Sequence, residues 1–142
     1  MAEIQNTNAT LYAENGHEKP RSEKLCVTSL LKGEVGLIEL KGWFDIENLN
    51  RVEHEMISLM KQRPRVIGIE CAELDGVDSS AIGSLVRFFN HSTLQDILLV
   101  LCDLNDALTR LFHTSKLDRY FTIMSGKEFN ELYCPRGGLR GK

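Results

Sequence analysis

The residues best placed to do chemistry in this chain are two adjacent serines, Ser79 and Ser80, which directly follow Asp78. A short apolar run of strand length precedes them at 66–69, and apolar residues follow them at helical spacing: Ile82, Leu85, Val86 and Phe89. Asp78 is a good helix N-cap, because its carboxylate can accept the free amide hydrogens of a first helical turn. We therefore expect both serine hydroxyls in that turn, where the positive end of the helix dipole favours a phosphate.

The elements that must position this motif alternate between strand and helix. In order, the patterns predict strands at 25–31 and 34–41, a helix over 46–62, a strand over 66–71, the helix after the serines to about residue 90, a strand over 97–102, a helix carrying Leu104 to Phe112, a short strand at 121–123 and a last helical turn or two around 127–133. This order indicates an α/β fold. An opening hairpin leads into a mixed β-sheet, and consecutive helices pack over one side of it.

The serines are expected at the rim formed by the carboxyl ends of the strands. Functional sites of open α/β sheets gather at that rim, and the loop at 42–47 should lie there as well. Asp45, in this loop, is a second candidate for contact with a partner. An ordinary helix N-cap is an equally good interpretation of Asp45.

The serine motif resembles the hallmark of a known family, the STAS domain, and within it the anti-sigma factor antagonists. That hallmark is a strand, an acidic turn, D-S-S-G-L-G and a helix, and here it reads Asp78-Ser79-Ser80-Ala81-Ile82-Gly83. The similarity extends over roughly residues 24–133 and includes the segments at 42–45, 96–104 and 105–123. Three departures bear on loop geometry and partner choice: Ala81 replaces a glycine, Glu70 an aspartate, and Gly76 a common aromatic residue.

The resemblance implies a switch based on phosphorylation. It places the phosphoacceptor at the second serine, Ser80, with Ser79 as the second choice. It also implies a partner that is both an anti-sigma factor and a serine protein kinase, and a separate serine phosphatase. A phosphate next to Asp75 and Asp78 would repel a surface suited to a neutral hydroxyl. The residues expected to form the partner-binding surface are Asp45, Asp75, Asp78, Ser79, Ser80 and Ala81.

Other interpretations of the motif stay open. The two serines could simply cap the helix. A hydrolase with a serine nucleophile needs a nearby base and usually a G-x-S-x-G elbow, and the sequence offers neither, so we expect no enzymatic activity. Stand-alone STAS modules also resemble subunits of lipid-transport ATPases and of stress-signalling complexes. This last alternative keeps the fold and changes the partner.

Composition is typical of one small cytoplasmic domain. The chain has 142 residues, of which 42% are hydrophobic, enough for one core. Its net charge of −3 argues against a nucleic-acid partner, which requires a basic face. No apolar run approaches membrane-spanning length, so we expect no membrane insertion. We expect a mobile polar arm over 1–23, the STAS domain over 24–133 and a loose basic tail over 134–142.

Cysteines and histidines are dispersed through the chain. The cysteines at 26, 71, 102 and 134 form no C-x-x-C pair, and the histidines at 17, 54, 91 and 113 show no metal-ligand spacing. The cysteines are therefore expected to serve as small core residues, and no metal or cofactor is expected.

Overall fold

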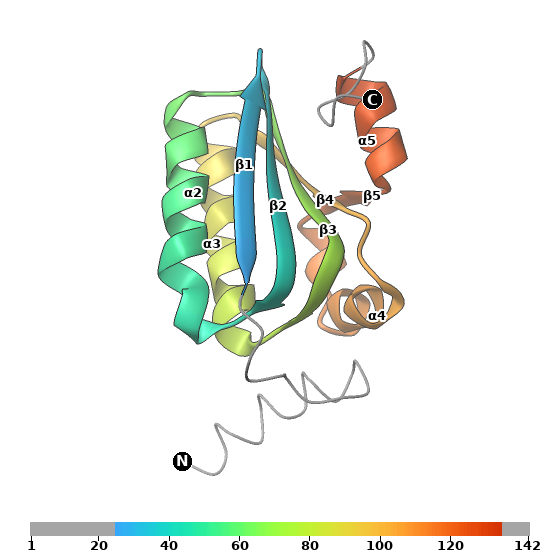
Figure 1. Cartoon of the computed structure of the whole chain (residues 1–142). Helices are drawn as coiled ribbons and strands as arrows, with labels where there is room; N and C mark the ends of the chain where they lie inside the picture. The colour runs from blue at the N-terminus through green and yellow to red at the C-terminus, as the bar shows by residue number, and fades with distance from the viewer. Residues whose placement is uncertain (1–24, 135–142) are drawn as a thin grey trace.

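The computed structural model describes residues 25–134, which form a five-stranded sheet with helices on both faces (Figure 1). The strand order is β1-β2-β3-β4-β5, with β1 antiparallel to β2 and the other neighbours parallel. The mixed α/β fold predicted from the sequence is confirmed. In chain order the elements are β1 (Cys26–Lys32), β2 (Val35–Phe44), η1 (Ile46–Asn48), α2 (Leu49–Lys61), β3 (Val66–Val77), α3 (Ser79–Leu94), β4 (Leu98–Cys102), α4 (Asp106–Thr114), η2 (Leu117–Arg119), β5 (Thr122–Met124) and α5 (Gly126–Tyr133).

Two apolar cores lie on opposite faces of the sheet. Alternate residues of β4 point to different cores: Leu99 and Leu101 belong to the larger one, and Val100 to the smaller one. Because both faces are covered, β4 and the first four residues of β3 are continuous apolar runs rather than alternating ones. Buried side chains of α2, α3 and α4 fill the larger core, and Phe129 of α5 fills the smaller one.

The last helix lies on the opposite face from α2 and α3 (Figure 1), whereas the sequence predicted helices on one side. Helices that cross between parallel strands are held to one side by the right-handed rule, but α5 follows the last strand and makes no such crossover. Gly68 on β3 makes room for it. A Cβ at Gly68 would lie 2.7 Å from the Phe129 ring, so this close approach requires glycine.

Strand β3 is longer than predicted. It continues through the expected acidic turn as far as Val77. Its second half pairs with β2, where Trp43 lies opposite Gly76 and Phe44 opposite Val77 after two register shifts. Leu74 and Val77 are both buried there. Gly76 is therefore a residue of the sheet and not of the acidic turn that the family resemblance placed before Asp78.

Helix α3 turns a slightly different face to the core than its spacing predicted. Leu85 is buried as expected, but the fully buried aromatic residue is Phe88, and Phe89 is only half-buried. Ser84 and Ser92, both buried, complete the inner face. Short polar side chains at these positions bring the helix close to its neighbours, which a pattern search for apolar residues does not detect.

The cysteines divide between core and surface. Cys71 and Cys102 are buried, as expected, but Cys26 is exposed on β1. The predicted arm over 1–23 lies outside the described residues, as does the predicted tail apart from Cys134. No helix between Leu25 and Cys134 is long and apolar enough to cross a membrane.

Candidate functional site

The serine motif lies where β2 and β3 end, at the lower end of the sheet in Figure 1. These strands run parallel, and Phe44 pairs with Val77 at their last register position. An aspartate directly follows the last residue of each strand, so Asp45 and Asp78 lie side by side. The predicted rim is therefore present, and it consists of the start of η1 and the start of α3.

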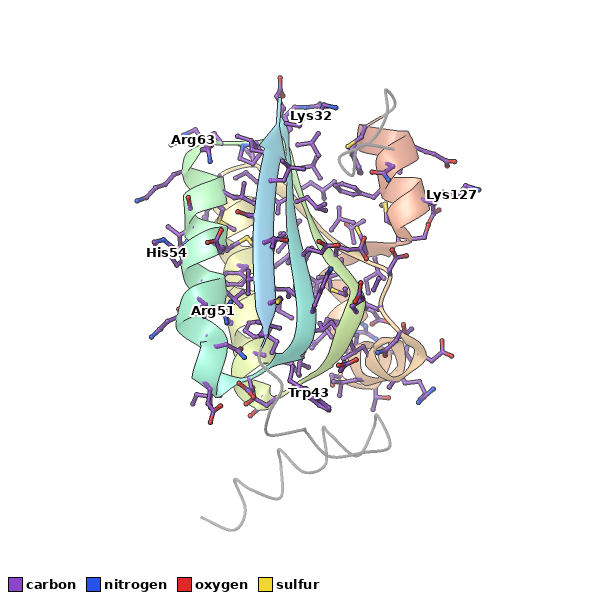
Figure 2. The ribbon with its side chains drawn as sticks, viewed as in Figure 1. Lys32, Trp43, Arg51, His54, Arg63 and Lys127 are labelled. Atoms are coloured by element: carbon purple, nitrogen blue, oxygen red, sulfur yellow. The ribbon has the colours of Figure 1, made fainter. Side chains whose placement is uncertain are left out.

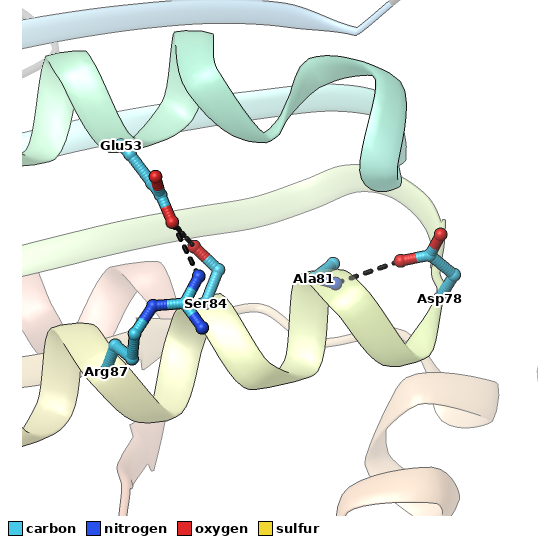
Figure 3. Close-up of polar contacts among 5 residues, drawn as sticks. All are labelled: Glu53, Asp78, Ala81, Ser84 and Arg87. Carbon is cyan, nitrogen blue, oxygen red and sulfur yellow. Dashed lines mark hydrogen bonds and ion pairs between the residues drawn. The ribbon is translucent and has the colours of Figure 1, made fainter.

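Asp78 joins these two segments. Its Oδ1 accepts a hydrogen bond from the amide of Ala81 at 2.9 Å, which caps α3 as predicted (Figure 3). Its Oδ2 accepts a second hydrogen bond from the amide of Ile46 at 3.1 Å. Asp78 is only 1% exposed, and its own amide donates to the carbonyl of Phe44 at 3.2 Å. One buried carboxylate thus fixes the loop after β2 against the helix that carries the serines.

Asp45 has a similar role in the short helix η1. It is 2% exposed, and its Oδ1 accepts from the amide of Glu47 at 3.0 Å. The side chain of Asn48 completes a capping box, since its Oδ1 accepts a hydrogen bond from the Asp45 amide at 2.9 Å. Its Nδ2 donates a further hydrogen bond to the Trp43 carbonyl at 2.9 Å. The N-cap interpretation of Asp45 is therefore correct. Asn48 was not predicted, although its position three residues after Asp45 is a capping-box signal.

The surroundings of the Asp78 carboxyl shift its pKa upward. Burial raises its pKa above the ordinary 3.8, and the negative charge of Asp45 acts in the same direction. Hydrogen bonds from the amides of Ala81 and Ile46 partly offset this rise. The amides of Ala81 and Ile46 thus hold this carboxylate in place by hydrogen bonds.

The six predicted site residues separate into a buried and an accessible set. Asp45, Asp78 and Ala81 are buried, so they position the rim and present little surface. Ser79 is exposed, and both Ser80 and Asp75 are half-buried. Ile46 was missed by the sequence analysis and is 63% exposed beside the serines. The sequence does show that an apolar residue follows the N-cap Asp45 directly, and this position could have indicated an exposed apolar side chain.

The geometry suits reversible modification of a hydroxyl. Ser80 lies in the first turn of a 16-residue helix, close to the amides that stabilise negative charge. Among residues 25–134, no group of three His, Cys, Asp or Glu side chains is placed to hold a metal ion. What the rim offers is two hydroxyls and an exposed apolar side chain on a rigid frame.

Comparison with protein families identifies the domain. The model of the STAS domain matches residues 30–129, which is most of the described chain. The chain belongs to the STAS domain family. The resemblance to the STAS domain noted from the serine motif is therefore confirmed. No curated protein matches the sequence.

Solved structures with the same fold include anti-sigma factor antagonists. One from Mycobacterium paratuberculosis has 12% identity and a TM-score of 0.67, covering 84% of this chain and 100% of its own. A putative one from Thermotoga maritima has 15% identity and a TM-score of 0.66, covering 78% and 95%. The Bacillus cell fate determinant SpoIIAA in its phosphorylated form has 14% identity and a TM-score of 0.60, covering 77% and 98%. At these identities the likeness establishes the fold.

Proposed function

We propose that this STAS domain is an anti-sigma factor antagonist whose partner binding is gated by phosphorylation of Ser80. With a free hydroxyl it binds an anti-sigma factor that is also a serine kinase, and a serine phosphatase reverses the phosphorylation. One observation carries the proposal: Ser80 is partly accessible in the first turn of α3, on a rim that buried hydrogen bonds hold in place. The domain is proposed to have no catalytic activity of its own.

The fold tolerates the phosphate, whereas the partner does not. A phosphate adds a charge of about −1.5 to −2 near neutral pH, and the start of a helix stabilises such a charge. Asp78 keeps α3 and the η1 loop together from beneath, so the rim does not need to rearrange. The added charge and bulk then meet a partner surface that fitted a neutral hydroxyl, and binding weakens through repulsion and desolvation.

Accessibility assigns different roles to the residues of the rim. Ser79, Ser80 and Asp75 have surface available to a partner, and exposed Ile46 adds an apolar contact next to them. Apolar side chains near the centre of an interface commonly contribute most of its binding energy. Asp45, Asp78 and Ala81 support these residues from within. Ser80 is preferred over Ser79 as the acceptor because the family pattern places the phosphate on the second serine.

In the first step of the test, the full-length chain is used as bait to capture a partner protein from its native cells. The chain is then incubated with that partner and ATP. Mass spectrometry should find one phosphate, on Ser80. Ser80→Ala should abolish the modification and keep the partner bound, and Ser80→Asp should weaken binding without unfolding the domain. Ser79→Ala is the matched control, because it changes helix-end stability by about 1 kcal/mol or less and leaves the acceptor in place.

Three results would contradict the proposal. Phosphate on Ser79 alone, or on neither serine, would remove the assigned acceptor. Capture of a transporter ATPase or a stress-complex scaffold in place of an anti-sigma kinase would favour the alternative STAS functions. Turnover of ester or peptide substrates that depends on Ser80 would indicate an enzyme.

A further inference from the structure

A second surface of the domain lies far from the serine rim, between the C-terminal halves of α2 and α3. A groove of about 540 Å³ runs there between the two helices. Buried Met60 and Phe88 line it, and Ile57 lines it as well although it is 52% exposed. The groove thus has an apolar lining, part of which is exposed to solvent in the domain by itself. We propose that it binds an acidic amphipathic helix of a protein partner.

Unpaired positive charge surrounds the upper part of this groove. Lys61 and Arg63 line it, and within residues 25–134 neither of them takes part in an ion pair. The one acidic side chain in the lining, Glu53, is already bonded to Arg87 at 2.6 Å and to Ser84 at 3.1 Å (Figure 3). The local charge balance is therefore positive although the whole chain has a net charge of −3.

The carbonyls at the C-termini of α2 and α3 already accept hydrogen bonds from backbone amides. Free carbonyls at the C-terminus of a helix attract cations, but several of the carbonyls here accept hydrogen bonds from the amides of the capping residues. The amides of Gln62 and Arg63 donate to the carbonyls of Leu59 and Met60, and the amide of Gln95 donates to that of His91. The side chains of Lys61 and Arg63 are thus available for carboxylates of a partner.

The shape of the groove favours a helix over a small molecule. Sites for small ligands bury most of the ligand surface, whereas this groove lies open between two surface helices. A helix can place apolar residues at i, i+3 or i+4, and i+7 into such a groove and keep acidic residues on its flanks. Those acidic flanks would meet Lys61 and Arg63, and the apolar stripe would cover Ile57.

This docking surface acts independently of the serine switch. His91 lies three helical turns beyond Ser80, which is about 16 Å along the axis of α3. At physiological ionic strength the screening length is about 8 Å, so a phosphate on Ser80 changes the potential at the groove little. A partner held here stays bound in both phosphorylation states.

The test uses the full-length chain and a synthetic helical peptide of about 18 residues with leucines on one face and glutamates on its flanks. In nitrogen-15 NMR spectra the peptide should shift signals from residues 57–63 and 87–95 and leave those of 78–82 in place. A control peptide with lysine at every glutamate position should bind far more weakly. Ser80→Asp should leave the affinity for the acidic peptide unchanged.

Variants of the protein locate the charge. Lys61→Glu combined with Arg63→Glu should weaken peptide binding about tenfold. The matched control is Lys116→Glu combined with Lys127→Glu, which should bind as the parent does. Arg63 and Lys116 share a left-handed backbone, with φ of 52° and 62°, and Arg63 and Lys127 lie on opposite sides of the molecule in Figure 2. Ile57→Ser, at an exposed position, should weaken binding without affecting the fold.

Several outcomes would overturn the proposal. The first is that the acidic peptide does not bind. The second is that the lysine peptide binds as tightly as the acidic one. The third is that the control variant loses as much affinity as the Lys61 and Arg63 variant, which would indicate unspecific electrostatic attraction. Groove signals that move with protein concentration in the absence of peptide would show that a second copy of the chain occupies the surface. None of these results bears on phosphorylation of Ser80, so this proposal and the proposed function can fail separately.

Discussion

The serine rim lies at the starts of η1 and α3, the groove lies between the C-terminal halves of α2 and α3, and the carboxylates of these two regions have opposite environments. At the rim, Asp45 and Asp78 are buried and bonded to backbone amides. At the groove, Glu53 is partly exposed and bonded to the side chains of Arg87 and Ser84. Burial raises the pKa of Asp78, whereas the hydrogen bond from Arg87 lowers the pKa of Glu53.

This difference shows how the domain divides its tasks. Backbone amides cannot move away from Asp78 without unwinding a helix end, so the rim has a fixed geometry. Long, exposed side chains such as Arg87 can change their hydrogen-bond partners at little cost, so the surface of the groove is more adaptable than the rim.

The largest effect is expected beneath the groove. Phe88→Ala should lower the free energy of unfolding by about 3 to 5 kcal/mol, because it leaves a cavity in the larger core. Phe89→Ala should cost less, since Phe89 is half-buried and its ring packs edge-on against Tyr120 and Phe121 with centroids 6.1 and 5.5 Å apart. Urea unfolding of both variants measures the difference. A larger loss for Phe89→Ala would mean that α3 turns Phe89, and not Phe88, toward the core.

At the rim, Asp78→Ala should cost about 1 to 3 kcal/mol, because two amides lose their acceptor. Asp78→Asn should fall between this variant and the parent, since an amide oxygen can serve only one of the two donors well. Asp75→Ala is the control, and at its half-exposed position it should change stability by less than about 0.5 kcal/mol. Equal urea midpoints for Asp78→Ala and Asp75→Ala would show that the rim does not depend on the buried carboxylate.

The ion pair at the groove should contribute less. A double-mutant cycle with Glu53→Gln and Arg87→Gln should give a coupling energy of about 0.2 to 1 kcal/mol, decreasing with added salt. Both side chains contact water, which screens their attraction. A coupling as large as the whole Asp78→Ala effect would remove the proposed distinction between a fixed rim and an adaptable groove.

The smallest signals are the titrations of the two carboxylates. Carbon-13 NMR should place the midpoint of Asp78 above 3.8 and that of Glu53 below 4.5. For Asp78 the folded state keeps its proton to a higher pH than the unfolded chain, so stability falls as pH rises between the two pKa values. For Glu53 the contribution is present above the unfolded pKa and is lost as pH falls through the folded pKa. Shifts in the same direction for both groups would contradict the contrast.

Local sequence signals were sufficient for some of these features. The helix start at Asp78, the capping option for Asp45 and the burial of Leu85 all follow from residue type and spacing over a few positions. The position at which β3 ends could not be predicted from such local signals. Residues 72–77 look like a turn because glycine and acidic side chains occur there, and only pairing with the second half of β2 keeps them extended.

By itself, the sequence determined the order of strands and helices, the family and the serine motif at a helix start, because short-range periodicity and capping chemistry decide such features. The tertiary structure alone decided which aspartates are buried, that Ile46 is exposed beside the serines, and that α2 and α3 form a basic groove. Each of these depends on residues far apart in the chain, such as Ile46 with Asp78 and Glu53 with Arg87. Such pairs meet only when the parallel sheet brings consecutive crossovers together.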